Sequence, residues 1–218
     1  MLYIISTPIG NLGDITLRGL KTIENCDYIL AEDTRRTAKL LNHYNLKKAL
    51  FSYNKINENK KTQFVIQDLL SGKNIGLVSD SGTPLISDPG SYLIRECIKN
   101  NIPLSPIPGA SAAIAALTCS GMPTDRFTFY GFVPKKTGKR KNIFSEIVSR
   151  GETAILYESP HRLLKTLKEL SEAMPEKQIA IAREMTKKFE EFIKGNPKEV
   201  IEMLSKKSIK GEIVIIIN

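Results

Sequence analysis

Short apolar runs alternate with stretches of helical spacing along the first half of the chain. The runs are LYIIS, DYILAED, ALFSY, NIGLVSD and IPLSPIP, and segments such as TLRGLKTIEN and RRTAKLLNHY lie between them. Strands of this kind with helices between them are typical of a parallel sheet covered by helices. We therefore predict an α/β fold whose N-terminal domain, residues 1–112, holds a mainly parallel sheet.

The second half of the chain predicts a different sheet. A small-residue helix, PGASAAIAALTCSGM, precedes the runs RFTFYGFVP, ETAILYESP, KQIAIAREM, KFEEFIKGN and GEIVIIIN. The connection within IAREMTKKFEEFIKG is too short for a crossover helix, so these two strands should form an antiparallel hairpin. We predict a second α/β domain over residues 113–218 with a mixed sheet, and a ligand site in the cleft between the domains.

Composition and charge narrow the class of protein. The 218 residues are 41% hydrophobic, which suffices for packed cores, and no run approaches the roughly 20 apolar residues of a membrane span. MLYIIS lacks the basic start and long apolar core of a signal peptide, so we expect a cytoplasmic protein. The net charge of +9 favours a polyanionic partner. When Lys and Arg bind phosphates, counterions are released, and this release strengthens binding.

The cysteines do not predict a metal site or a disulfide framework. Cys26, Cys97 and Cys119 are odd in number, far apart in sequence and set among apolar neighbours. Such spacing favours buried thiols. No other cluster with the spacing of metal ligands stands out, so we expect no metal.

Four predicted strand ends carry loops richer in Gly, Pro and hydroxyl side chains than a connection needs. They are STPIGNLGD, SDSGTPLISDPG, IPGAS and YESPHR. Open α/β sheets bind ligands beyond the carboxyl ends of their strands, and glycines permit a close backbone approach. The spacing fits neither the dinucleotide fingerprint nor the P-loop. The simpler alternative for STPIGNLGD is a strand-to-helix turn with Asp14 or Thr16 as the helix cap.

In their order along the chain, these motifs resemble the tetrapyrrole methylase superfamily of S-adenosylmethionine-dependent methyltransferases. The resemblance runs from TPIGNLGD through AEDTRRT, SDSGTPLISDPG, PGASA, FYGFVPKK, YESPHR and AREMTK to the final GEIV. AEDTRRT and YESPHR are similar to the branch that acts on ribosomal RNA, and they differ from relatives that methylate precorrins or the diphthamide precursor. One departure is Ser81, where members commonly carry Ala; the exchange of small residues should preserve cofactor binding.

The resemblance implies a two-domain enzyme, usually a homodimer, that binds S-adenosylmethionine in the cleft between its domains. The implied reaction is methyl transfer to the ribose 2′-hydroxyl of a cytidine in the decoding region of 16S ribosomal RNA, with no membrane partner. Many members continue into a further small helical domain, a difference that we expect to affect RNA affinity or substrate positioning rather than methyl transfer. The implied cofactor residues are Pro8, Gly10, Asp80, Ser81, Gly82, Thr83, Ser111, Ala112, Tyr157, Glu158 and Met185.

Methyl transfer to a hydroxyl needs a group that accepts its proton or stabilises the forming alkoxide. Acid and base side chains in AEDTRRT and AREMTKK supply candidates. Our hypothesis makes Glu184 or Asp33 the proton acceptor and Lys187 the group that steadies the oxygen. The alternative for each residue is an ion-paired helix start.

Basic residues near the strand ends are candidates for binding phosphates. Arg35 and Arg36 would hold phosphates that flank the target, and the run PKKTGKRK would bind others. We expect the aromatic residues of FYGFV to pack as a strand of the second core rather than to stack on bases. The candidate RNA-binding residues are Arg35, Arg36, Lys135, Lys136, Lys139, Arg140 and Arg162.

Two other functions are compatible with the same fold. A methyltransferase acting on a small anionic tetrapyrrole shares it, but AEDTRRT, YESPHR and the basic run argue against this reading. A non-catalytic RNA-binding or assembly module has no need of four elaborated strand ends. The fold alone does not decide among these functions.

Overall fold

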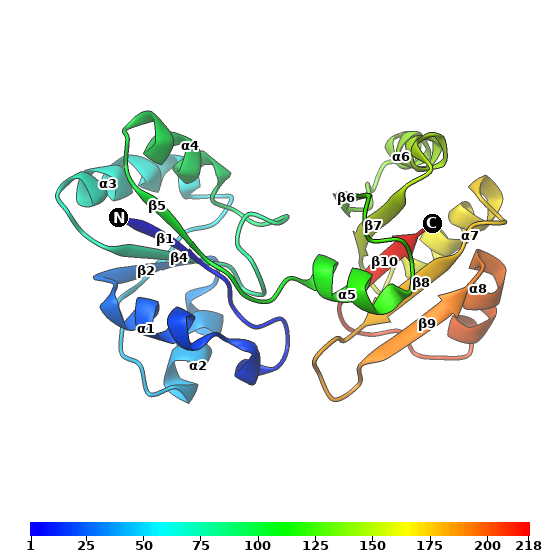
Figure 1. Cartoon of the computed structure of the whole chain (residues 1–218), viewed down its shortest axis with the longest axis horizontal. Coiled ribbons are helices and arrows are strands. Elements are labelled where there is room, and N and C mark those ends of the chain that lie inside the picture. The colour runs from blue at the N-terminus through cyan, green and yellow to red at the C-terminus, as the bar shows by residue number, and fades with distance from the viewer. The chain divides into compact units, whose positions relative to one another are not determined.

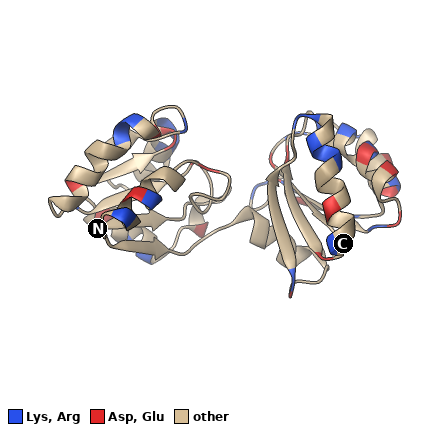
Figure 2. Cartoon of the chain, turned by 90° about the horizontal axis from the view of Figure 1, so that it is seen from above, with Lys and Arg blue, Asp and Glu red and all other residues tan.

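The computed structural model describes residues 1–218 and divides them into two compact units, Met1–Ser111 and Ala112–Asn218 (Figure 1). Each unit has its own sheet and its own hydrophobic core. Figure 2 shows that the charged residues of both units lie mainly on helices and loops, while the strands are largely uncharged. None of the helices combines the length and the hydropathy that crossing a membrane requires.

The first unit is built on the parallel sheet that the sequence predicts. Five strands pair in the order β3-β2-β4-β1-β5, and every pairing is parallel. The central strands are buried on both faces, which is why they read as continuous apolar runs. The strands are β1 (Leu2–Ile5), β2 (Tyr28–Ala31), β3 (Leu50–Ser52), β4 (Ile75–Val78) and β5 (Leu104–Ile107).

Helices cover both faces of this sheet. Successive strand residues point to opposite faces, so Leu30 and Ile29 of β2 belong to two separate core clusters. Leu93 of α4 packs in the first cluster and Leu40 of α2 in the second. The helical elements are a 3-10 turn, η1 (Leu12–Asp14), followed by α1 (Leu17–Asn25), α2 (Thr34–His43), α3 (Glu58–Leu70) and α4 (Ser91–Lys99).

The second unit contains the predicted mixed sheet, with strand order β6-β7-β10-β8-β9. β6 and β7 are parallel, and the other pairings are antiparallel. The expected hairpin is confirmed, because β8 and β9 are antiparallel neighbours joined by a short turn. The strands are β6 (Phe127–Phe132), β7 (Thr153–Glu158), β8 (Ile179–Arg183), β9 (Glu191–Gly195) and β10 (Ile213–Ile217).

One face of the second sheet carries a continuous core. Phe144, Leu167 and Val200, from three different helices, pack there with alternate residues of the strands. The remaining helix, α5, contacts β7, β8 and β10 and contributes nothing to that core, so it lies on the other face. The helices are α5 (Ala112–Ser120), α6 (Thr137–Arg150), α7 (Leu163–Ala173) and α8 (Pro197–Ser205).

The three cysteines are free, and their burial differs from the expectation at one position. Cys26 and Cys97 are buried, and burial raises the pKa of each thiol to about 11. The expectation of a buried thiol is wrong for Cys119, which is exposed. The buried face of α5 includes Ala116 and Leu117, and helical spacing turns Cys119 away from it.

Candidate functional site

The loops that follow β1 and β4 lie together at the carboxyl edge of the first sheet. The amide of Thr7 donates to the carbonyl of Gly82 (2.9 Å), and the amide of Gly82 donates to the carbonyl of Thr7 (3.1 Å). β1 and β4 are neighbours, yet the chain continues from β1 to β2 on one side and from β4 to β5 on the other. A reversal of this kind is where open α/β sheets bind ligands.

The loop after β5 joins this pair through Thr83 and Gly109. The hydroxyl of Thr83 donates to the carbonyl of Ala110 (3.0 Å) and lies 3.1 Å from the hydroxyl of Ser6. A Cβ atom on Gly109 would lie 2.8 Å from the Cβ of Ser6, so only glycine permits this approach. The adjoining loops thus hold the predicted cofactor residues of the first unit, Pro8, Gly10, Asp80, Ser81, Gly82, Thr83 and Ser111.

Asp80, just after β4, contacts the chain that follows β2. Its carboxylate accepts a hydrogen bond from the amide of Asp33 (2.9 Å) and lies 3.5 Å from Nε of Arg36. The amide of Asp80 donates in turn to the carboxylate of Glu32 (3.4 Å). The structure therefore brings the motifs AEDTRRT and SDSGTP together at this edge of the sheet.

Asp33 is committed to the structure of α2. Its carboxylate caps the helix by accepting from the amide of Arg35 (2.9 Å), and it also accepts two hydrogen bonds from the Arg35 guanidinium (3.0 and 2.6 Å). These hydrogen bonds hold the pKa of Asp33 well below its ordinary value. Asp33 is therefore a weak proton acceptor, and its surroundings match the alternative of an ion-paired helix start.

Two carboxyl groups that the sequence analysis did not select lie at the same edge. Burial raises the pKa of Asp88 to about 6, and the charge of Glu32 adds to the effect. Burial also raises the pKa of Glu32, against a hydrogen bond from the amide of Asp80. Lys55 opposes both shifts, and its ammonium donates to the carbonyl of Ser87 (3.1 Å). A carboxyl group with a pKa near 6 can exchange a proton close to neutral pH.

In the second unit, Glu158 ends β7 with its carboxylate satisfied inside the fold. It accepts hydrogen bonds from the hydroxyl of Thr166 (2.6 Å) and the amide of Ser159 (2.6 Å), and it pairs with Arg162 (2.5 Å). Its side chain is fully buried, so only its main chain remains for a ligand. The neighbouring ring of Tyr157 is partly exposed. Arg162, a predicted RNA contact, forms this pair while its side chain stays 27% exposed.

The structure overturns the expectation that Arg140 binds RNA. Arg140 is only 3% exposed, because it shares the buried face of α6 with Phe144. Its guanidinium pairs with Glu169 and donates to the carbonyls of Pro134 (2.9 Å) and Lys135 (3.0 Å). The other basic residues of the run that we selected, Lys135, Lys136 and Lys139, are exposed.

The turn after β8 pairs Glu184 with Lys187. Oε1 of Glu184 accepts hydrogen bonds from Nζ of Lys187 (2.9 Å) and from the amide of Glu212 (3.1 Å). Burial raises the pKa of Glu184, but these two donors outweigh it and leave the pKa below its ordinary value. Burial lowers the pKa of Lys187, but Glu184 and Glu212 outweigh it and raise the pKa. Both groups are therefore charged at neutral pH, and Met185 beside them is buried.

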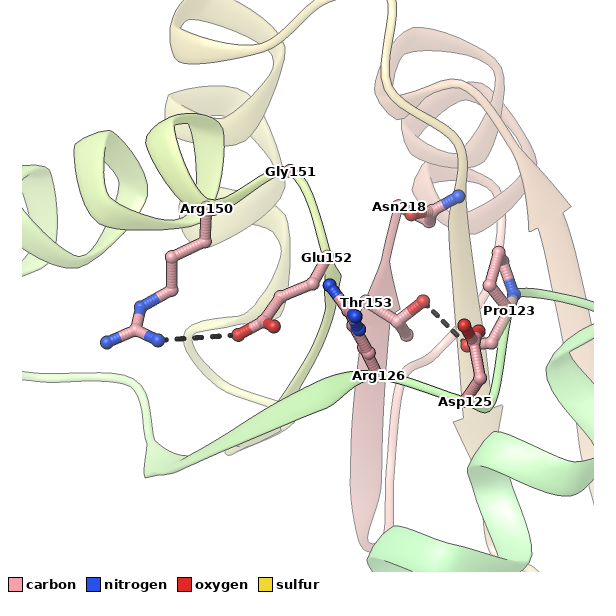
Figure 3. A pocket seen from close by; sticks show the side chains of 8 residues that line it. All are labelled: Pro123, Asp125, Arg126, Arg150, Gly151, Glu152, Thr153 and Asn218. Carbon is pink, nitrogen blue, oxygen red and sulfur yellow. Dashed lines mark hydrogen bonds and ion pairs between the residues drawn. The ribbon is translucent and has the colours of Figure 1, made fainter.

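A pocket of about 260 Å³ lies at the amino end of β7 (Figure 3). Its lining includes Arg126, Arg150, Glu152, Thr153 and Asn218, and none of the predicted site residues. Arg150 pairs with Glu152 (3.4 Å), and Thr153 donates to the carbonyl of Pro123 (2.8 Å). The predicted residues of β7 lie at its other end, so this pocket is distinct from the candidate site.

Known proteins are similar to this chain in both sequence and fold. The family described as Tetrapyrrole (Corrin/Porphyrin) Methylases matches residues 1–201. A protein from Mycoplasmopsis pulmonis named Ribosomal RNA small subunit methyltransferase I is 48% identical over 99% of this chain and 96% of its own length. Proteins of the same name from Thermotoga maritima and Halalkalibacterium halodurans are 43% and 44% identical, and the chain covers 97% and 75% of them.

Solved structures agree with these matches at the level of the fold. A crystal structure of diphthine synthase aligns with a TM-score of 0.77 over 99% of this chain and 88% of the other, at 14% identity. Uroporphyrin III C-methyl transferase from Thermus thermophilus aligns with a TM-score of 0.67 over 100% of this chain and 96% of the other, also at 14% identity. With the family match over residues 1–201, the chain therefore belongs to the tetrapyrrole (corrin/porphyrin) methylase family of methyltransferases.

Proposed function

We propose that this chain is an S-adenosylmethionine-dependent methyltransferase that modifies the ribose 2′-hydroxyl of a cytidine in the decoding region of 16S ribosomal RNA. Relatives at 42–48% identity over nearly the whole chain carry the name Ribosomal RNA small subunit methyltransferase I, which supports RNA of the small subunit as the acceptor. The resemblance of AEDTRRT and YESPHR to the ribosomal branch supports the cytidine hydroxyl.

The observation that carries the cofactor assignment is the pairing of the β1 and β4 loops through Thr7 and Gly82. The residues there fit a cationic sulfonium compound, because the side chain of Asp80 is 22% exposed and Glu32 and Asp88 add acidic groups. A carboxylate accepts strong hydrogen bonds from an ammonium group. S-adenosylmethionine, when bound, supplies an electrophilic methyl group on its sulfur.

We assign cofactor binding to residues of both units. In the second unit they are Ala112, Tyr157, the main chain of Glu158, and Met185. In the first unit they are the loop residues after β1, β4 and β5, namely Pro8, Gly10, Asp80, Ser81, Gly82, Thr83 and Ser111.

The protein's own part in the reaction is to orient the hydroxyl and stabilise its developing charge. Lys187 fits this role, because its ammonium is charged at neutral pH and partly exposed. Glu184 holds Lys187 in place through their hydrogen bond. Of the two proposed proton acceptors we favour Glu184 over Asp33, because Asp33 is bound by three hydrogen bonds from Arg35.

Exposed cations are proposed to bind the phosphates of the RNA. Arg35 and Arg36 project from the first turn of α2, and their side chains are 86% and 62% exposed. In the second unit the basic run contributes Lys135, Lys136 and Lys139. The resemblance also supports a homodimer that works in the cytoplasm.

The proposed function is tested by transfer of a labelled methyl group from S-adenosylmethionine. Small ribosomal subunits that lack the modification serve as one acceptor, and a uroporphyrinogen-type tetrapyrrole serves as the other. We expect label in the RNA and none in the tetrapyrrole. Label in the tetrapyrrole alone, or saturable cofactor binding with no transfer to RNA, would contradict the proposal.

A further inference from the structure

The edge strand β6 carries exposed aromatic side chains. Phe132 is 59% exposed, and Phe129 is partly exposed. Both rings lie edge-on to Tyr157 of the neighbouring strand, with centroids 5.0 Å (Phe129) and 5.4 Å (Phe132) from that of Tyr157. We call Phe129 and Phe132 the aromatic strip; Tyr157, which we assign to the cofactor, packs against both rings. The exposure of Phe132 contradicts the expectation that the aromatic residues of FYGFV pack in the second core, whereas Tyr130 does pack there.

A β-bulge in β6 produces the strip. Phe129 lies opposite Ile155 and Gly131 lies opposite Leu156, so Tyr130 is the additional residue. Gly131 has φ +67°, a conformation that glycine adopts without strain. The bulge leaves Tyr130 packed against the core and moves Phe132 to the other face, in register with Tyr157.

The exposed lysines begin directly after the strip. Lys135 follows Phe132 by three residues, a span of at most about 11 Å. Lys136 and Lys139 are also exposed, and Lys136 directly precedes α6, whose first turn has no side-chain cap. Unpaired amide groups at a helix start attract phosphate, so they strengthen the attraction that the lysines exert on it.

Two arginines fix the backbone that carries these lysines. Arg162 donates to the carbonyl of Val133 (3.0 Å), and Arg140 donates to the carbonyls of Pro134 (2.9 Å) and Lys135 (3.0 Å). Each arginine is neutralised by a glutamate, Glu158 for Arg162 and Glu169 for Arg140. The two guanidinium groups therefore position the segment, while the lysines remain available to a ligand.

We propose that the aromatic strip stacks on an unpaired RNA base beside the target nucleotide, while Lys135, Lys136 and Lys139 bind the adjoining phosphates. The inference rests on the proposed function. Aromatic rings and cations side by side are the usual combination for single-stranded RNA. Charge decides the occupant, because RNA phosphates neutralise the lysines, whereas a second copy seated on the strip would bring like charges together.

The test replaces Phe132, which is exposed and is not among the proposed cofactor residues. Phe132→Leu removes the ring, Phe132→Tyr keeps it, and Phe64→Leu on α3 is the matched control, since Phe64 is 63% exposed. The probe is an oligocytidylate strand carrying one 2-aminopurine, whose fluorescence falls when the base stacks. We expect Phe132→Leu to weaken binding roughly tenfold and to reduce the quenching, while Phe132→Tyr and Phe64→Leu match the wild type.

Two further measurements separate the possible failures. Calorimetry should show unchanged S-adenosylmethionine affinity in all three variants, and sedimentation should show an unchanged oligomeric state. If Phe132→Leu methylates and binds RNA as the wild type does, or alters only the oligomeric state, the stacking role is wrong while the proposed function stands. If the wild type neither binds nor methylates RNA, both proposals are wrong.

Discussion

Thr7 and Gly82 exchange main-chain hydrogen bonds across 75 positions of sequence, at 2.9 and 3.1 Å. The hydroxyl of Thr7 adds a hydrogen bond to the carbonyl of Ser79 (3.2 Å). Backbone groups paired in this way keep their geometry without a ligand, which lowers the entropic cost of binding one. The proposed cofactor site is thus shaped by the fold itself.

Replacing Thr83 by Val should weaken cofactor binding. The valine lacks the hydroxyl that donates to the carbonyl of Ala110 and contacts Ser6, so a partly buried acceptor loses its partner. A loss of about 1 kcal/mol corresponds to an S-adenosylmethionine Kd raised roughly fivefold by calorimetry. Thr83→Ser keeps the hydroxyl and should bind like the wild type. Equal affinity of the Val and Ser variants would show that the hydroxyl does not shape the site.

Asp88 should make stability depend on pH. Because the pKa of Asp88 is raised from 3.8 to about 6 on folding, its stabilising contribution is complete below about pH 4 and is lost as pH rises through 6. Asp88→Asn removes this titration. Between pH 4 and pH 8 the wild type should therefore lose about 1–3 kcal/mol of unfolding free energy relative to the variant. Urea unfolding across this range measures the difference. Parallel pH profiles for the two proteins would refute the shift.

Gly211→Ala should disturb the pair of Glu184 and Lys187. Gly211 has φ +92°, and a Cβ there would lie 2.2–2.4 Å from the Glu184 side chain. Gly72 is the matched control, with φ +94° and no atom within 4 Å of the added Cβ. Both alanines should cost about 1 kcal/mol for the left-handed backbone, and Gly211→Ala should cost more and slow methyl transfer.

The excess cost at Gly211 can be assigned by a second substitution. In a Glu184→Ala background the clashing carboxylate is absent, so Gly211→Ala should cost no more than Gly72→Ala does. Thermal unfolding of the single and double variants measures this comparison. An excess cost that survives in the double variant would mean that Glu184 is not the obstacle.

The same substitution should affect different properties at Arg140 and Lys139, namely stability at Arg140 and RNA binding at Lys139. Arg140→Met leaves the Glu169 carboxylate and two carbonyls without their donor, so it should lower the unfolding free energy by about 3–5 kcal/mol. Lys139→Met, one position away and exposed, should change stability by less than about 0.5 kcal/mol while weakening RNA binding. Denaturant unfolding and RNA titration decide between these roles, and the reverse pattern would contradict them.

Apolar patterning predicted the sheets because each strand run is short and bounded by helical or turn sequence. The β8–β9 hairpin followed from the short connection between its strands, and the parallel sheet followed from the helices between the first strands. These features depend on local sequence and on connection length, both of which can be read directly.

Features that depend on tertiary surroundings could not be read in this way. The burial of Arg140 depends on Glu169 from another helix, and the exposure of Phe132 depends on one additional residue in β6. The raised pKa of Asp88 depends on burial and on Glu32, which is far away in sequence. In each case a residue type common on surfaces or in cores has its role set by partners that the local sequence does not identify.

The central claim is tested most directly by identifying the methylated nucleoside. Small ribosomal subunits lacking the modification are incubated with this protein and labelled S-adenosylmethionine, and the RNA is digested to nucleosides. The account predicts that the label is found in 2′-O-methylcytidine, and that Lys187→Met greatly reduces it while leaving cofactor affinity intact. Label in a base-methylated nucleoside, or in no nucleoside despite saturable cofactor binding, would contradict the account.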